Sequence, residues 1–127
     1  FFNLISFLTV KENMCLTSQI KGKKVDEKEL NQVLKLLGLE QKKDSFANEL
    51  SGGQQQRVAI GRAILAHADI ILADEPTGNL DGENAENVMD ILKVLNGKGK
   101  TIVLVTHDLK IANYADRIIR LEQGKIV

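Results

Sequence analysis

The 127-residue chain has little of several features that mark whole classes of protein. Its single cysteine, Cys15, excludes an internal disulfide, and a lone thiol of this kind is expected to act as a small apolar side chain in a reducing compartment. Seventeen basic and seventeen acidic side chains cancel, so no overall field draws the chain onto nucleic acid or an anionic bilayer. Any binding site must therefore be local.

Long apolar runs are also missing. The longest, at residues 70–73 and 101–105, are too short to cross a bilayer as helices. The apolar opening, FFNLISFLTV, lacks the basic residues and the small-residue cleavage site of a signal peptide. Because the chain opens on Phe1 and not on methionine, we expect that its beginning has been cut away.

The first part of the chain has helical patterns only. Thr9 and Glu12 have the spacing of a capping box, which predicts a short helix, followed by a polar and basic loop over residues 17–24. Residues 25–38 place apolar side chains at helical spacing, with acidic residues in the first turn and Gly38 where a C-terminal cap belongs. This segment is an amphipathic helix by prediction.

From residue 51 onward, helical and extended patterns alternate. Ser51 and Asp81 are each well placed as the N-cap of a helix. Compact apolar runs at residues 69–76 and 100–108 are typical of buried strands, and the only proline of the chain ends the first of them. The chain is expected to finish in a hairpin that turns at residues 123–124.

The order of these elements predicts an α/β fold. Two apolar strands separated by a helix form a right-handed βαβ unit, and such parallel strands need helices on both faces. Residues 9–50 contain helices without strands, so they are expected to be an insertion that lies beside the sheet.

The start of the helix after Ser51 is a candidate anion site. Gly52 and Gly53 would each weaken a helix by about 1 kcal/mol relative to alanine if they were only structural. At a helix N-terminus, however, the first amides lack intrahelical acceptors, and exposed glycines would let a phosphate oxygen reach the backbone and the Ser51 hydroxyl. An ordinary capped helix start is the alternative.

Polar residues follow both predicted strands. Asp74 and Glu75 come at the carboxyl edge, where open α/β sheets bind ligands; one carboxylate can hold Mg²⁺ while the other orients or deprotonates an attacking water. His107 ends the next strand and would point into the same crevice, where it could hydrogen-bond a phosphate or the water. A solvated loop and a structural histidine are the alternatives, and His67 is interpreted as structural.

In this order, the motifs resemble those of the nucleotide-binding domain of ABC transporters. LSGGQ (residues 50–54) is similar to the signature motif, IILADE (70–75) to the Walker B strand, NLD (79–81) to the D-loop and THD (106–108) to the H-switch. The resemblance covers essentially the whole chain. It implies a P-loop NTPase (RecA-like) core with an inserted α-helical subdomain, and it is nearest to the lipoprotein-release and macrolide or peptide-antibiotic export ATPases.

The resemblance also implies a role for each residue. Asp74 would hold Mg²⁺, Glu75 would be the catalytic base and His107 would contact the γ-phosphate of ATP. Asp81 would help the two sites of a head-to-tail dimer communicate. Four residues would bind ATP that is seated on the partner subunit: Ser51, Gly52, Gly53 and Gln54.

The resemblance implies an ATPase subunit that powers transport. Its partners would be a second nucleotide-binding domain and a transmembrane permease, and it would be cytoplasmic, peripheral on the cytoplasmic face of the membrane; no nucleic-acid partner is expected. A non-transport ABC protein that acts on DNA or ribosomes is one alternative. An inert fragment or interaction module is another.

The chain departs from the family pattern at its beginning. It contains no G-x-x-x-x-G-K-[ST] loop, no preceding adenine-stacking aromatic and no Q-loop glutamine, which would fall before Phe1. We therefore expect an N-terminally truncated domain that is inactive alone, with the helical subdomain over about residues 9–50 and the signature helix and the C-terminal part of the core over 51–127. Gly61 is expected to loosen the signature helix slightly.

Overall fold

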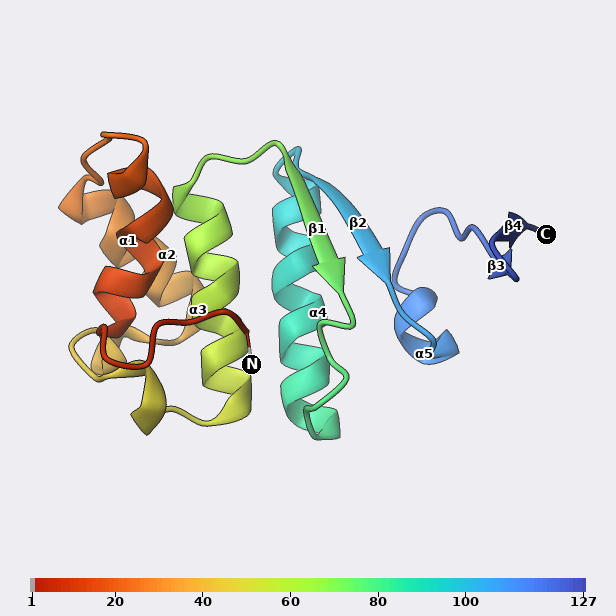
Figure 1. The fold of residues 1–127 in the computed structure, drawn as a ribbon, viewed down its shortest axis with the longest axis horizontal. Coiled ribbons are helices and arrows are strands. Elements are labelled where there is room, and N and C mark those ends of the chain that lie inside the picture. Colours follow the sequence, from red (N-terminus) through yellow and green to blue (C-terminus); the bar gives the residue numbers. More distant parts are fainter. Residues whose placement is uncertain (1) are drawn as a thin grey trace.

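The computed structural model of the chain describes residues 2–127 and shows a bundle of helices next to a small parallel sheet (Figure 1). The bundle is formed by α1 (Val10–Ile20), α2 (Glu27–Leu37) and α3 (Gly52–Leu65). Two short 3-10 helices connect α2 to α3, namely η1 (Glu40–Lys42) and η2 (Ala47–Glu49).

The second part of the molecule is built on the sheet. Its strands are β1 (Ile70–Asp74) and β2 (Thr101–Val105), with α4 (Gly82–Gly97) between them in sequence and behind them in Figure 1. Beyond β2, the chain forms α5 (Leu109–Ala112) and then the hairpin of β3 (Leu121–Glu122) and β4 (Lys125–Ile126), which extends away from the bundle. No helix in residues 2–127 has the length and apolar character needed to cross a membrane.

The helix caps of the first part confirm the sequence prediction. The Thr9 hydroxyl accepts the N–H of Glu12 at 3.2 Å, and the Glu12 carboxylate accepts the N–H of Thr9 at 2.8 Å, which together make a capping box. The predicted loop over residues 17–24 is wrong in its first half, because α1 continues to Ile20. Its last turn is held by the buried Ser18 hydroxyl, which donates to the carbonyl of Leu65 in α3 at 2.6 Å.

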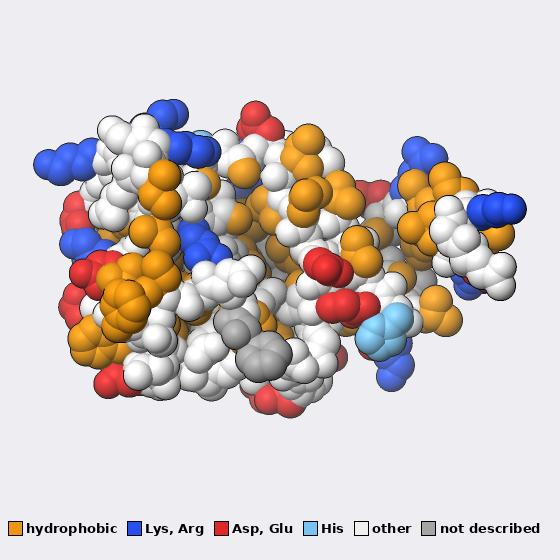
Figure 2. All heavy atoms as spheres, in the orientation of Figure 1, with side chains coloured by type: hydrophobic (Ala, Val, Ile, Leu, Met, Phe, Trp, Pro, Cys, Tyr) orange, Lys and Arg blue, Asp and Glu red, His pale blue; other side chains and the backbone are white. Residues whose placement is uncertain are grey.

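The two strands are parallel, as predicted, and pair in register from Ile70 with Thr101 to Asp74 with Val105. Their burial differs from the prediction. One face, which includes Ile71, packs into the core beneath the sheet. The other face is open, and its apolar side chains are between 46% and 77% exposed: Ile70, Leu72, Val103 and Val105. Figure 2 shows hydrophobic side chains on this face, so the expectation of helices on both faces is wrong for the described structure.

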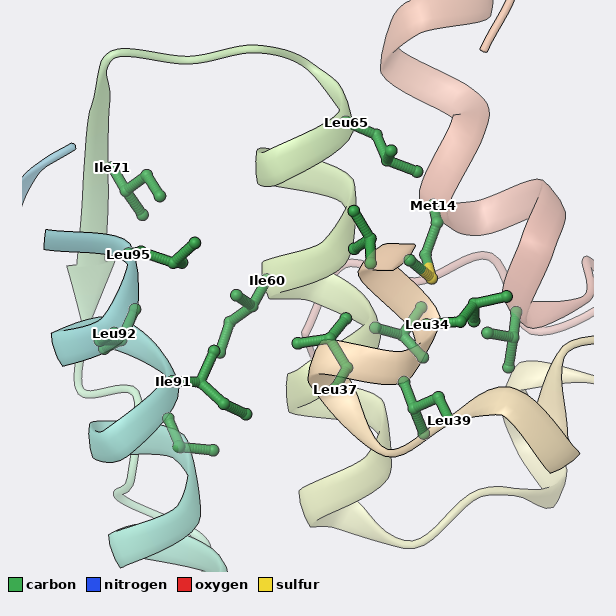
Figure 3. Close-up of a cluster of buried hydrophobic side chains, with 14 of the residues drawn as sticks. Met14, Leu34, Leu37, Leu39, Ile60, Leu65, Ile71, Ile91, Leu92 and Leu95 are labelled. Carbon is green, nitrogen blue, oxygen red and sulfur yellow. The ribbon is translucent and has the colours of Figure 1, made fainter. Parts of the chain in front are cut away.

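The helices of residues 9–50 lie to one side of the sheet, as expected, and α3 stands between them and the sheet. α1 and α2 pack on α3, and α3 packs on α4. A continuous apolar core joins these layers (Figure 3), with Met14, Leu37 and Leu65 on the bundle side and Ile91 and Leu95 on the α4 side.

Gly61 has a clearer role than the loosening that was expected of it. A Cβ atom at this position would lie 2.5 Å from Cε of Met14 and 2.8 Å from Cδ1 of Leu37. These separations are shorter than van der Waals contact, so any larger side chain would push into the core. Glycine here lets α1 and α2 approach α3 closely.

The hairpin at the end of the chain is confirmed. β3 and β4 are antiparallel, with Leu121 opposite Ile126. Gln123 and Gly124 both have a positive φ, as a two-residue hairpin turn requires. The strand residues of the hairpin are all exposed.

Candidate functional site

The loop after β1 has an unusual backbone. Glu75 has a φ of +43°, in the left-handed region that non-glycine residues rarely adopt. Backbone hydrogen bonds hold it there: its N–H donates to the carbonyl of Val105 at 2.8 Å, and its carbonyl accepts the N–H of Gly78 at 3.1 Å. Strained residues of this kind cluster at functional sites, where surrounding contacts fix them in place.

The Glu75 carboxylate is held by the residues that follow β2. Its Oε1 accepts the backbone N–H of His107 at 2.8 Å and lies 2.7 Å from Nδ1 of the same residue. Its Oε2 accepts the Thr106 hydroxyl at 3.1 Å. The predicted proximity of Glu75 and His107 is therefore confirmed, and Figure 2 shows acidic side chains and a histidine together on the surface where the strands end.

These contacts influence the ionisation of the Glu75 carboxylate. The side-chain hydrogen bond from His107 lowers the pKa of Glu75 below its ordinary value, and the His107 N–H and the Thr106 hydroxyl act in the same direction. The carboxylate is thus ionised at neutral pH and able to accept a proton. The His107 side chain is 86% exposed, so its Nε2 is open to a ligand.

Asp74 ends β1 with its side chain exposed, and it forms no side-chain hydrogen bond or ion pair within residues 2–127. No cluster of three or more His, Cys, Asp or Glu side chains that could hold a metal occurs in that part of the chain. A lone free carboxylate nevertheless fits Mg²⁺, which proteins usually bind through one or two carboxylates together with water and substrate phosphates.

At the start of α3, Ser51 and Gln54 satisfy each other. The Ser51 hydroxyl accepts the N–H of Gln54 at 3.3 Å, and Oε1 of Gln54 accepts the N–H of Ser51 at 3.0 Å. This capping box confirms Ser51 as the N-cap. The N–H groups of Gly52 and Gly53 find no acceptor in residues 2–127, so an unsatisfied pair of donors remains at the positive end of the helix.

The two glycines differ from the expectation that both are exposed. Gly52 is exposed, but Gly53 is buried against α4. A Cβ atom on Gly53 would lie 2.7 Å from Cγ of Asn84. Glycine at this second position therefore serves the packing of α3 on α4, whereas an open approach to the backbone exists only at Gly52.

Asn84 connects this helix start to Asp81. Its Nδ2 donates to both carboxylate oxygens of Asp81, at 3.0 and 2.9 Å, and its N–H donates to Oδ1 at 2.9 Å. These bonds confirm Asp81 as the N-cap of α4 and lower its pKa. The structure thus brings Gly53, Asn84 and Asp81 together, separately from the group of Glu75, Thr106 and His107.

Sequence reasoning missed two residues of these groups. Thr106 directly precedes His107, and Asn84 stands three residues after the N-cap Asp81, where a side chain can return to the cap. These positions in the sequence are the features from which the two residues could have been found. His67 lies elsewhere, at the far end of α3, with Nε2 3.4 Å from Oε1 of Glu29.

Comparison with known proteins gives a consistent result. The family model described as "ABC transporter" matches residues 1–78. The macrolide export ATP-binding/permease protein MacB of Campylobacter jejuni subsp. jejuni is 51% identical over 128 residues, covering 99% of this chain and 20% of that protein. The uncharacterized ABC transporter ATP-binding protein MJ1508 of Methanocaldococcus jannaschii is 46% identical, covering 99% of this chain and 57% of that protein.

Solved structures agree. The dimeric structure of MJ0796, a bacterial ABC transporter cassette, superposes with a TM-score of 0.84 at 45% identity, over 98% of this chain and 57% of that chain. A post-hydrolysis dimer of MJ0796 bound to ADP and Pi gives 0.84 at 44% identity over the same shares. The chain thus spans a fifth to little more than half of these relatives. The P-loop NTPase fold predicted from the motifs is confirmed, and the chain belongs to the ABC transporter family.

Proposed function

We propose that this chain is part of the ATP-binding and ATP-hydrolysing domain of an ABC transporter. In this proposal, residues of about 9–50 belong to the helical subdomain, and residues 51–127 supply the signature helix and the C-terminal part of the core. The observation that carries the proposal is the Glu75 carboxylate, which is held between Thr106 and His107 at the carboxyl ends of two parallel strands.

Each residue at the strand ends has a distinct part in hydrolysis. ATP would supply the transferred phosphoryl group, and Mg²⁺, when bound, would offset the negative charge on its oxygens. Asp74 would hold the metal with its free carboxylate. Glu75 accepts the proton of the attacking water, for which its ionised state is suited. His107 uses its exposed Nε2 to hydrogen-bond the γ-phosphate while Nδ1 stays on Glu75.

The start of α3 serves a nucleotide on another subunit. The free N–H groups and the positive helix end favour a phosphate there, next to the hydroxyl of Ser51 and the amide of Gln54. Gly52 provides open access, and Gly53 keeps α3 close to Asn84 and Asp81, through which the two sites communicate. The dimeric form of the related MJ0796 cassette supports a second copy of the domain as the partner that we propose to pair head-to-tail.

The partners are a second nucleotide-binding domain and a transmembrane permease. The MacB relatives are named ATP-binding/permease proteins, which supports a permease in the same polypeptide or in an associated subunit. The domain works on the cytoplasmic face of the membrane. The 127 residues contain no G-x-x-x-x-G-K-[ST] loop to cradle the β- and γ-phosphates, so alone they are inactive.

The experiment that tests the proposal is the substitution Glu75→Gln in the complete transporter. The amide keeps the shape of the side chain but cannot take a proton, so ATP turnover is expected to fall by about a hundredfold or more. The ATP-bound dimer should persist, as measured by size-exclusion chromatography with nucleotide. The matched control is Glu40→Gln, which alters an exposed acid on η1 and should leave turnover unchanged. Ordinary hydrolysis by Glu75→Gln would remove Glu75 from the role of base.

A further inference from the structure

Thr106 contacts Glu75 in this site, but the proposed function above gives Thr106 no role. The residue follows β2 directly and is partly buried. Its Oγ1 accepts the N–H of Asp108 at 3.1 Å and lies 3.1 Å from Oε2 of Glu75. A hydroxyl has one proton to donate, and a backbone N–H can only donate, so the hydroxyl proton is directed at the carboxylate. The two contacts together fix the orientation of the hydroxyl.

The two oxygens of Glu75 are held unequally. Within residues 2–127, Oε1 accepts two hydrogen bonds, both from His107, whereas Oε2 accepts one, from the Thr106 hydroxyl. The His107 backbone N–H and imidazole both act on Oε1, so neither of them fixes Oε2. The Thr106 hydroxyl fixes the second oxygen, and with it the plane of the carboxylate. The last torsion of a glutamate is soft, so one point of attachment would let the carboxylate rotate.

We propose that Thr106 is a positioning residue that orients the Glu75 carboxylate through its hydroxyl. The effect of Thr106 on catalysis rests on the proposed function, in which Glu75 is the base. The hydrogen bond from Thr106 to the Glu75 carboxylate does not depend on that function. Threonine acts here through Glu75 and touches no substrate.

The first test uses the 127-residue chain and makes no reference to catalysis. Thr106→Val keeps the shape of the side chain and removes the hydroxyl, whereas Thr106→Ser keeps the hydroxyl and loses the methyl group. The readout is the hydrogen-exchange protection factor of the His107 amide, which donates to Glu75. Valine is expected to lower it by about tenfold, the effect of one hydrogen bond to a charged group, and serine to preserve it. Glu75→Ala gives the value for a lost acceptor.

The second test measures ATP hydrolysis in the complete transporter. Thr106→Val is expected to lower kcat by about tenfold with KM unchanged, because orientation of the base matters only in the chemical step. Thr106→Ser should restore kcat to within about twofold. If valine disturbs folding by leaving the Asp108 N–H unpaired, Thr106→Ser paired with Thr106→Cys, which keeps the size of serine with a weak donor, gives the same comparison.

The outcomes separate the two proposals. Wild-type protection of the His107 amide in the variant without a hydroxyl would overturn the positioning role. Equal loss of kcat in Thr106→Ser and Thr106→Val would also overturn it, because the methyl group would then be the part that matters. Loss of protection in Thr106→Val together with full activity of Glu75→Gln would support the positioning contact and refute the base role of Glu75.

Discussion

The helical end of the molecule buries most of its apolar side chains, with Phe7, Ile20 and Phe46 as exposed exceptions, while the strand end leaves many of them in solvent. Met14, Leu39 and Leu65 are 0% exposed in the helical end, but Leu72 of β1 is 77% exposed and Ile126 of the hairpin is 74% exposed. The helices therefore supply most of the continuous core, which also includes the inner face of the sheet. The strands complete one face only, and the proposed site lies at the edge of this open part, where its residues can meet another molecule.

The difference has its cause in the residue patterns. α2 has one apolar stripe, Leu30, Val33, Leu34 and Leu37, and the bundle covers all of it. Residues 70–73 are apolar at every position, so side chains on both faces of β1 need cover. α4 and α3 lie on one of these faces. A strand that is apolar at every position thus exposes apolar side chains on any face that no other element covers.

The largest expected effect comes from a matched pair of leucines, one from each end. Leu65→Ala removes a fully buried side chain between α3 and α1 and should lower the free energy of unfolding by about 2–5 kcal/mol. Leu72→Ala removes an exposed one and should change it by no more than about 0.5 kcal/mol. Urea denaturation followed by circular dichroism measures both. Similar losses in the two variants would mean that the open face of β1 is covered in solution.

The second comparison uses the neighbouring glycines at the start of α3. Gly53→Ala places a methyl group against Asn84 and should cost about 1–3 kcal/mol of stability, because the Asn84 side chain has to leave its place on Asp81. Gly52→Ala meets only Cδ2 of Leu80, at an ordinary contact distance of 3.7 Å, and should be neutral or slightly stabilising.

A companion variant identifies the cause of that loss. Asn84→Ala in the Gly53→Ala background removes the atoms that obstruct the new methyl group, so part of the stability should return. The urea midpoints of the single and double variants give the coupling between the two positions. Strictly additive effects of the two substitutions would show that contact with Asn84 is not the reason why position 53 requires glycine.

Much of the fold was predictable because it depends on residues close in sequence. The capping box of Thr9 and Glu12, the N-caps Ser51 and Asp81, and the hairpin turn each need only a few neighbouring residues. The length of α1 was misjudged because its last turn is held by a distant partner, the carbonyl of Leu65. The open face of the sheet was missed for the same kind of reason, since cover depends on the whole fold.

The site shows the same limit. Glu75 and His107 could be paired from the sequence because parallel strands place their carboxyl ends at one edge. Thr106 was missed as a contact of Glu75 because its place before His107 does not show where the Glu75 carboxylate turns. The burial of Gly53 depends on the position of α4, which no local pattern around the LSGGQ motif contains.

The smallest expected effect is a dependence of stability on pH that arises at the helix caps. Hydrogen bonds from Thr9 hold the pKa of Glu12 below its ordinary value of 4.5, and those from Asn84 hold the pKa of Asp81 below 3.8. A carboxylate whose pKa is lower in the folded state stabilises that state above its ordinary pKa, and the contribution is lost as the pH falls through the folded value. These two groups contribute to a decline in stability below about pH 5, as do Glu75, whose pKa is lowered by His107, and Glu27, whose pKa is lowered by Lys43.

Substitution of each carboxylate by the neutral amide measures how much the caps of α1 and α4 contribute to that decline. Glu12→Gln retains an oxygen that can accept the N–H of Thr9 but removes the titration, so its loss of stability below about pH 4.5 should be shallower than in the wild type. Asp81→Asn should act in the same way at lower pH, at the cap of α4. Urea midpoints measured over a pH series test both variants. An acid decline that is as steep in Glu12→Gln as in the wild type would mean that the cap of α1 does not contribute to it.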